Sequence, residues 1–442
     1  MRGIFPAEDS LLQRARALLR AEEATGLQGL VPGKIEAISQ FDITGMERVV
    51  AIIACGRSGA ELVASFFDGH DDVLMLPTLQ GDRVYQYFER YKSLTLHDKL
   101  IAYPVFSADL IYSDFFQGAF PVGSADYYAA VKAVFDVYGN SPPGFLNSRR
   151  AFFQLLHVVH CVAMGRHPAS RHPLILYPQH SWNNQLAKCL VEDFPQARFI
   201  HTVRDPITNC GRFFDYRFKM KDLYRQPALI PAYVIWNLSQ RDVPHRGMEQ
   251  RTLAIRFEDL HLHPEQTMRA LANWLGLPFR ASMLQSTVNG VPWVVQRGTT
   301  SWSGARPEQA IRDSGNISFT DEGVLFALLN ENFVAWDYPC PKIFKHALVR
   351  VLACALILII PMKMEIISAH GFIMKFPSWR NRSLHYAIKG LMHILLCRFA
   401  IMSIVVVNLC RRLAFGRRTT RLSVIKASET AISVPRSPEA YS

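Results

Sequence analysis

Cysteine is scarce in this chain of 442 residues, and none of the eight cysteines has a spacing that binds metal. There is no CxxC pair and no other metal-ligand spacing. We therefore expect reduced thiols that act as small apolar residues, no bound metal ion and a cytoplasmic setting. Internal repeats and low-complexity segments are also missing, so the composition is that of a globular protein.

The first residues lack an apolar run long enough for a signal peptide or a membrane anchor. The stretch SLLQRARALL predicts a short amphipathic helix instead, with Ser10 as its N-cap. We expect residues 1–45 to form a helical extension that precedes the main domain.

Acidic residues are almost missing from the last quarter of the chain. Residues 342–426 contain 15 Lys and Arg but one acid, Glu365, so this segment carries +14 while the whole chain carries +12. Because the remainder is close to neutral, the basic balance gives no reason to expect nucleic-acid binding by the main domain.

Two apolar runs lie within this basic segment, VLACALILIIPM at 351–362 and LMHILLCRFAIMSIVVVNLC at 391–410. The first is too short to span a membrane, and the second is long enough but contains a histidine, an arginine and an asparagine. The alternatives are helices lying on anionic lipid, which we favour, a spanning helix, and a helical cap on the main domain. We expect residues 338–426 to form a basic, apolar, membrane-associating helical extension and residues 427–442 a disordered tail.

Short apolar runs alternate with amphipathic stretches through the middle of the chain. The apolar runs are RVVAIIA (48–54), HPLILYP (172–178), ARFIHTVR (197–204) and RTLAIRFEDL (251–260). Apolar strands that alternate with helices predict a parallel sheet covered by helices on both faces. Ligands of such sheets bind at the carboxyl ends of the strands, where ACGRSG, PQH, VRDP and RFEDL fall.

The glycine-rich stretch after the first strand has the features of an anion site. Backbone N–H groups of such a turn point at the ligand, and the dipole of the following helix favours negative charge. Gly56 and Gly59 let the backbone approach closely, and Arg57 adds a permanent cation. The stretch is not a Walker A motif, because Ala60 and Glu61 stand where Lys-Ser/Thr would follow the second glycine. A purely structural turn is the alternative.

Two later segments also place charged residues after predicted strands. Arg204 follows the third strand and can bind an anion through its bidentate fork, while Pro206 can begin a helix. Glu258 and Asp259 follow the fourth strand, ahead of the amphipathic helix that begins at Pro264.

Taken in order, the three segments resemble the sulfotransferases that use 3′-phosphoadenosine-5′-phosphosulfate (PAPS), with the carbohydrate and tyrosyl-protein branches nearest. That family has a strand–[RK]SGT–helix loop for the 5′-phosphosulfate, an FIHxVRDP segment for the 3′-phosphate and a later EDL…P…LGLPF segment. The resemblance covers about residues 46–335. It implies an α/β, P-loop-like three-layer fold with a central parallel sheet flanked by helices, at residues 46–337, to which this chain adds the C-terminal extension. It also implies PAPS as co-substrate, no metal, and sulfuryl transfer to a hydroxyl-bearing acceptor, for which we favour a carbohydrate or a lipid-linked glycan.

The resemblance also implies which residues bind PAPS. They are Gly56, Arg57, Ser58, Gly59, Ala60, Arg204, Arg212 and Arg297. Ala60 and Glu61 stand where the family has hydroxyl residues. Arg212 stands where it has a serine eight residues after the RDP arginine, and an arginine can make the same phosphate contact. Arg297 lies in a segment that resembles the late loop over the nucleotide.

Four residues are candidates for the chemistry of transfer. Arg57 would neutralise charge on the leaving phosphate. A base must lie within hydrogen-bond reach of the acceptor hydroxyl, and His180, after the second strand, is placed like the catalytic histidine of the cytosolic branch. The other branches often use a carboxylate, for which Asp82 and Glu61 are the candidates. A non-catalytic nucleotide-binding protein is the main alternative, because of the residues that replace the loop hydroxyls, and a nucleotide kinase is disfavoured by the missing Walker lysine.

Overall fold

The structure is a computed structural model that describes most of the chain between residues 6 and 359. The described residues are 6–54, 58–76, 81–110, 124–179, 184–219, 248–297, 300–312, 315, 317–359, 362–363, 365–367, short pieces between 388 and 407, and 423–425.

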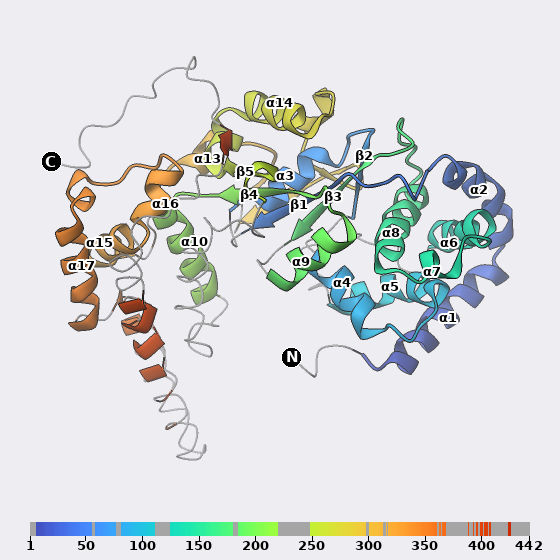
Figure 1. The fold of residues 1–442 in the computed structure, drawn as a ribbon, viewed down its shortest axis with the longest axis horizontal. Helices are drawn as coiled ribbons and strands as arrows, with labels where there is room; N and C mark the ends of the chain where they lie inside the picture. The colour runs from blue at the N-terminus through green and yellow to red at the C-terminus, as the bar shows by residue number, and fades with distance from the viewer. Residues whose placement is uncertain are drawn as a thin grey trace.

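A parallel sheet of six strands forms the centre of the molecule (Figure 1). The strands are β1 (Val49–Ala54), β2 (Val73–Met75), β3 (Leu174–Gln179), β4 (Arg198–Val203), β5 (Thr252–Arg256) and β10 (Ser423–Ile425). They pair in the order β10-β5-β4-β1-β3-β2, and every pair is parallel. The predicted α/β class with a central parallel sheet is therefore confirmed, and the carboxyl ends of β1, β3, β4 and β5 share one edge.

The apolar sequence of β1 explains why helices cover both faces of the sheet. Val49, Ala51 and Ile53 belong to one core cluster, and Val50 and Ile52 belong to another on the opposite face. This alternation follows from the two-residue period of a strand. Because both faces are buried, the strand is apolar throughout.

Helices account for most of the remaining described residues. They are α1 (Glu8–Ala24), α2 (Val31–Ser39), α3 (Ala60–Phe67), α4 (Gly81–Arg90), α5 (Leu96–Leu110), α6 (Ala125–Tyr138), α7 (Pro143–Leu146), α8 (Arg149–Ala163), α9 (Asn184–Asp193), α10 (Pro206–Lys219), α13 (Phe257–Leu262), α14 (Pro264–Leu275), α15 (Phe319–Leu328), α16 (Asn330–Ala335) and α17 (Ala347–Ile359). Two hairpins, β6 (Thr287–Val288) with β7 (Val291–Pro292) and β8 (Val294–Arg297) with β9 (Thr300–Ser303), follow α14.

The N-terminal helix forms as predicted but starts earlier. It begins at Glu8, so the prediction of Ser10 as N-cap is wrong. Glu8 and Asp9 in its first turn favour the earlier start, because acidic side chains interact well with a helix N-terminus. Leu11 and Ala15 are fully buried in the core cluster that also holds α5, α6 and α8.

The C-terminal helices pack on one end of the sheet domain. Figure 1 shows α15–α17 at one end of the long axis and α1, α2 and α6 at the other. Their core includes Phe333 and Trp336 together with Ile207 of α10 and Ala254 of β5. The strand β10 lies in the segment that was expected to be helical, and it pairs with β5. The domain boundaries expected after residues 45, 337 and 426 remain predictions.

Candidate active site

The turn after β1 is tied to the neighbouring strand β4. The Ser58 side chain is fully buried, and its Oγ lies 2.8 Å from Oγ1 of Thr202 on β4. Gly59 follows with φ +94° and precedes the first helical residue of α3, Ala60. The N-terminus of α3 therefore lies at the carboxyl edge of the sheet, beside the end of β4.

The space around Gly59 excludes any other residue without a rearrangement. Its φ lies in the left-handed region that favours glycine. A Cβ at this position would lie 2.6 Å from Cδ2 of Phe257, the first residue of α13. The second glycine of the loop is thus explained by both backbone conformation and packing.

Arg204 lies on the same phenylalanine. It directly follows β4, is buried, and has its guanidinium carbon 4.0 Å from the centroid of the Phe257 ring, a cation–π contact. Its Nη2 donates to the carbonyl oxygen of Gln309, 3.3 Å away. Phe257 thus brings together the first loop and the VRDP segment, which sequence patterns had placed at one edge of the sheet.

A buried carboxylate holds the turn that carries Arg204. Oε1 of Glu258 accepts the backbone N–H of Asp205 at 3.0 Å, and Oε2 accepts the Tyr338 hydroxyl at 2.6 Å. Burial raises the pKa of Glu258, while these two hydrogen bonds act in the opposite direction. Oδ1 of Asp205 in turn accepts the backbone N–H of Thr208 in the first turn of α10. The RDP turn is therefore fixed by the hydrogen bond from Asp205 N–H to Glu258, and the side chain of Asp205 caps the N-terminus of α10.

A neutral histidine lies beside this network. Nδ1 of His261 accepts the backbone N–H of Arg306 at 2.8 Å, and its ring packs edge-on against Phe257. Burial, and then the charge of Arg204, lowers the pKa of His261 to about 4. It is a structural acceptor that holds the segment before Gln309 next to Arg204.

The other predicted site residues are placed only in part. Arg212 lies on α10, half-buried, and Glu61 lies in the first turn of α3. Asp82 is the second residue of α4, and Arg297 ends β8. Gly56, Arg57 and His180 lie outside the described residues. Across the part of the chain that the structure describes, no cluster of His, Cys, Asp or Glu could hold a metal ion.

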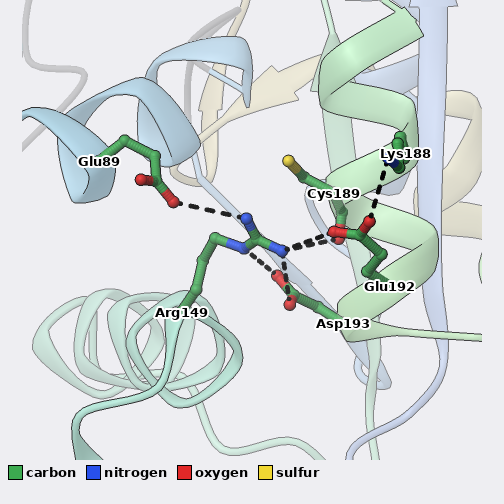
Figure 2. Close-up of polar contacts among 6 residues, drawn as sticks. All are labelled: Glu89, Arg149, Lys188, Cys189, Glu192 and Asp193. Carbon is green, nitrogen blue, oxygen red and sulfur yellow. Dashed lines mark hydrogen bonds and ion pairs between the residues drawn. The ribbon is translucent and has the colours of Figure 1, made fainter.

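An arginine that sequence patterns had not singled out joins the two helices after β2 and β3. Nε and Nη2 of Arg149, at the start of α8, donate to the two carboxylate oxygens of Asp193 at 2.7 and 3.0 Å (Figure 2). Its Nη1 lies 3.5 Å from Oε1 of Glu89 on α4, and its Nη2 lies 3.4 Å from Oε2 of Glu192 on α9. The Arg149 cluster therefore links α4 to α9. Of the candidate bases, Asp82 lies on α4 and His180 precedes α9 by four residues in the sequence.

Phe257, Tyr338, His261 and Arg149 give no signal in the sequence. Phe257 continues the apolar pattern of a strand, and Tyr338 is 80 residues from its partner Glu258. Arg149 is one of 49 Lys and Arg and stands in no motif. Only the three-dimensional structure brings Phe257, Tyr338 and His261 together around Arg204 and its turn, and Arg149 to the helices α4 and α9.

A buried arginine and a helix N-terminus at the carboxyl edge of a parallel sheet are features typical of a site for an anionic ligand. The family model described as "Sulfotransferase family" matches residues 50–281, just over half of the chain. The chain belongs to the sulfotransferase family, which confirms the resemblance found in the sequence.

Solved structures of sulfotransferases show a distant similarity to this chain. The sulfotransferase domain from the Synechococcus PCC 7002 olefin synthase is 19% identical over 54% of this chain and 76% of its own length, with a TM-score of 0.30. The sulfotransferase domain from the curacin biosynthetic pathway is 15% identical over 67% and 94%, with a TM-score of 0.35. Sulfotransferase STF9 from Mycobacterium avium is 12% identical over 64% and 76%, with a TM-score of 0.31. No curated protein matches the chain.

Proposed function

We propose that this sulfotransferase uses PAPS as its sulfuryl donor. The observation that carries the proposal is the shared packing of Gly59 and Arg204 on Phe257. It puts a helix N-terminus and a buried guanidinium close together at one edge of the sheet. PAPS carries negative charge at both its 3′-phosphate and its 5′-phosphosulfate, so two separate positive positions fit it.

The roles of the residues follow from this assignment. Backbone N–H groups at Ser58, Gly59 and Ala60 would hold the phosphosulfate, together with Gly56 and Arg57 by resemblance to the family. The 3′-phosphate would be bound by Arg204, Arg212 and Arg297. Bound PAPS supplies the sulfuryl group.

The chain must also accept a proton from the acceptor hydroxyl. His180 is our first candidate, with Asp82 and Glu61 as the alternatives, and Arg57 would neutralise charge on the leaving phosphate. We propose a carbohydrate or lipid-linked glycan as the acceptor, because the sequence resembles the carbohydrate branch, which with the tyrosyl-protein branch is nearest, and because the C-terminal segment is basic and apolar. The proposed location is the cytoplasmic face of a membrane, where lipids are anionic.

Calorimetric titration of 3′-phosphoadenosine-5′-phosphate, the desulfated nucleotide, tests the donor. The wild-type protein should bind it, and Arg204→Ala should weaken binding at least about tenfold, because a charge-assisted contact is lost. Arg269→Ala is the matched control, since Arg269 is half-exposed on α14 and pairs with Glu265. An unchanged affinity in Arg204→Ala would contradict the assignment, and ATP binding without binding of the desulfated nucleotide would favour a kinase.

A second candidate function, nucleotide binding without transfer, is favoured by Ala60. This residue is buried at the start of α3 and offers no hydroxyl to a sulfate. Assays with labelled PAPS and lipid-linked glycans distinguish the two functions. Label in a glycan supports transfer to it. Nucleotide binding with no labelled product supports the non-catalytic alternative, and label in a protein tyrosine or a small phenol rejects the glycan acceptor.

A further inference from the structure

A stripe of large apolar side chains is exposed near the C-terminus. The described residues between 388 and 407 are helical. Seven of them form what we name the outer stripe: Ile388, Met392, Leu395, Leu396, Phe399, Val406 and Val407. Their exposure ranges from 46% at Val406 to 69% at Phe399. Positions 388, 392, 395, 396 and 399 are three or four residues apart and Val406 follows Phe399 by seven, so these positions share one side of the helical pieces that the structure describes.

The other side of this segment is held on the protein. Arg398 Nη1 lies 2.8 Å from Oε2 of Glu365, and both side chains are mostly buried. Ile404 packs against the core cluster that contains Phe333 and Trp336. Arg398 and Ile404 therefore attach this segment to the domain, and neither residue belongs to the outer stripe.

Helix α17 and the turn before it also expose apolar side chains and lysines. Ile343, Leu348 and Leu352 are exposed, and so are the side chains of Lys342 and Lys345. Figure 1 shows the helical pieces between 388 and 407 at the same end of the molecule as α17. Exposed apolar side chains that gather at one end of a protein are typical of a surface that contacts a protein or a membrane.

The charge of the segment identifies the partner. Glu365 is the single acid among residues 342–426, and it is buried in its pair with Arg398. The charge that remains on this segment is therefore positive. Exposed apolar side chains beside lysines and arginines complement a bilayer surface with anionic headgroups. A second copy of this chain would instead bring positive charge against positive charge.

We propose that the outer stripe inserts into the surface of an anionic bilayer with its helix in the membrane plane, and that the segment does not cross the bilayer. The inference rests on the proposed membrane association and specifies its surface and orientation. Among the residues that the structure describes, no helix is long and apolar enough to span a membrane.

Co-sedimentation of the full chain with phosphatidylcholine vesicles, with and without phosphatidylserine, tests the proposal. The wild-type protein should bind only the vesicles that contain phosphatidylserine, and added salt should weaken this binding. The double variant Leu395→Asp and Phe399→Asp should bind at least about tenfold more weakly, because two apolar side chains no longer enter the bilayer. Val291→Asp, at an exposed valine on β7, is the matched control and should bind like the wild type.

Each further outcome has a defined meaning. Release of bound protein by alkaline carbonate supports the in-plane orientation, and retention overturns it in favour of a spanning segment. If the double variant binds as well as the wild type, and circular dichroism shows that both proteins are folded, the outer stripe is not the surface that inserts. Membrane association itself would then stand. Absence of wild-type binding overturns membrane association as well, but it leaves the use of PAPS to be decided by the nucleotide titration and the labelled-PAPS assays. A dimer that the double variant breaks, without vesicle binding, assigns the stripe to a second copy.

Discussion

At the scale of single residues, Gly59 controls whether the first turn and Arg204 can share the Phe257 ring. Gly59→Ala places a methyl group in a positive-φ conformation, which costs about 1–2 kcal/mol, and brings it 2.6 Å from Phe257. Displacing that ring adds about 1–3 kcal/mol of destabilisation and moves the surface on which Arg204 lies. We expect lower stability in urea together with weaker binding of 3′-phosphoadenosine-5′-phosphate.

The matched control for this prediction is Gly165→Ala. Gly165 also has a positive φ, +66°, but a Cβ there would meet nothing within 4 Å. It should show the backbone penalty alone, with unchanged nucleotide affinity. Equal losses in the two variants would mean that the contact with Phe257 is unimportant.

Tyr338 gives the second prediction at this scale. Tyr338→Phe removes the O–H donor to Glu258 and should lower the free energy of unfolding at neutral pH by about 1–3 kcal/mol. The pKa of Glu258 is already raised in the folded protein, so its ionisation opposes folding as the pH rises above its ordinary value of 4.5. Losing a donor to the carboxylate raises that pKa further. The destabilisation should therefore shrink as the pH is lowered from 7 toward 5.

Urea unfolding at several pH values tests this dependence. Tyr138→Phe is the control, because the Tyr138 hydroxyl donates to the backbone carbonyl oxygens of Ile38 and Phe41. Its destabilisation should not vary over the same pH range. A flat difference in Tyr338→Phe would show that the hydroxyl does not act through the Glu258 carboxylate.

At the scale of elements, the Arg149 cluster joins the helices α4, α8 and α9. Arg149→Lys keeps the charge but loses the planar fork that holds both oxygens of Asp193. We expect about 1–3 kcal/mol of destabilisation, since the side chain is only 19% exposed. The rate of sulfuryl transfer should fall while the affinity for the desulfated nucleotide stays the same, because the helices α4 and α9 accompany candidate bases and not Arg204.

The neighbouring Arg150 provides the control for the Arg149 cluster. Its ion pair with Glu47 lies nearer the surface, where such pairs contribute little. Arg150→Lys should change neither stability nor rate appreciably. A loss of nucleotide affinity in Arg149→Lys equal to its loss of rate would contradict the separation of the two regions.

At the scale of the whole molecule, the parallel sheet and four of its strands, β1, β3, β4 and β5, were predictable because they depend on periodic signals, whereas the short strand β2 was not predicted. The run VVAIIA reads as a strand buried on both faces, and glycine or charged residues after each strand mark the carboxyl edge. The contacts within the site were not predictable. Phe257 contacts Gly59 and Arg204 through the shape of its ring, and Tyr338 donates to Glu258, which is 80 residues away. Neither contact produces a local sequence pattern.

The strand β10 was missed for a related reason. Three residues, Ser423–Ile425, are too few to show a two-residue period, and the surrounding composition is basic and favours an extension outside the domain. What makes them a strand is the open edge of β5, which offers unpaired backbone groups. Pairing with the edge of β5, rather than the local strand propensity of these three residues, determines their structure.

The pairing of β10 with β5 leads to a prediction about how the C-terminal segment is attached to the main domain. The C-terminal segment is held first by the core that contains Phe333, Tyr338 and Met362, and again by β10, which pairs with β5. Val424→Pro removes a backbone donor beside Ala254 and should release the second attachment. Trypsin should then cleave the arginine-rich stretch RRLAFGRRTTR (411–421) several-fold faster, because local release precedes proteolysis.

The control for this prediction is Val424→Thr, which keeps both the backbone N–H and a β-branched side chain. Trypsin should digest this variant at the wild-type rate. Nucleotide binding should be unaffected in both variants, since Arg204 lies on the far side of β5 from β10. Cleavage at the wild-type rate in Val424→Pro would mean that pairing with β5 does not hold the segment in place.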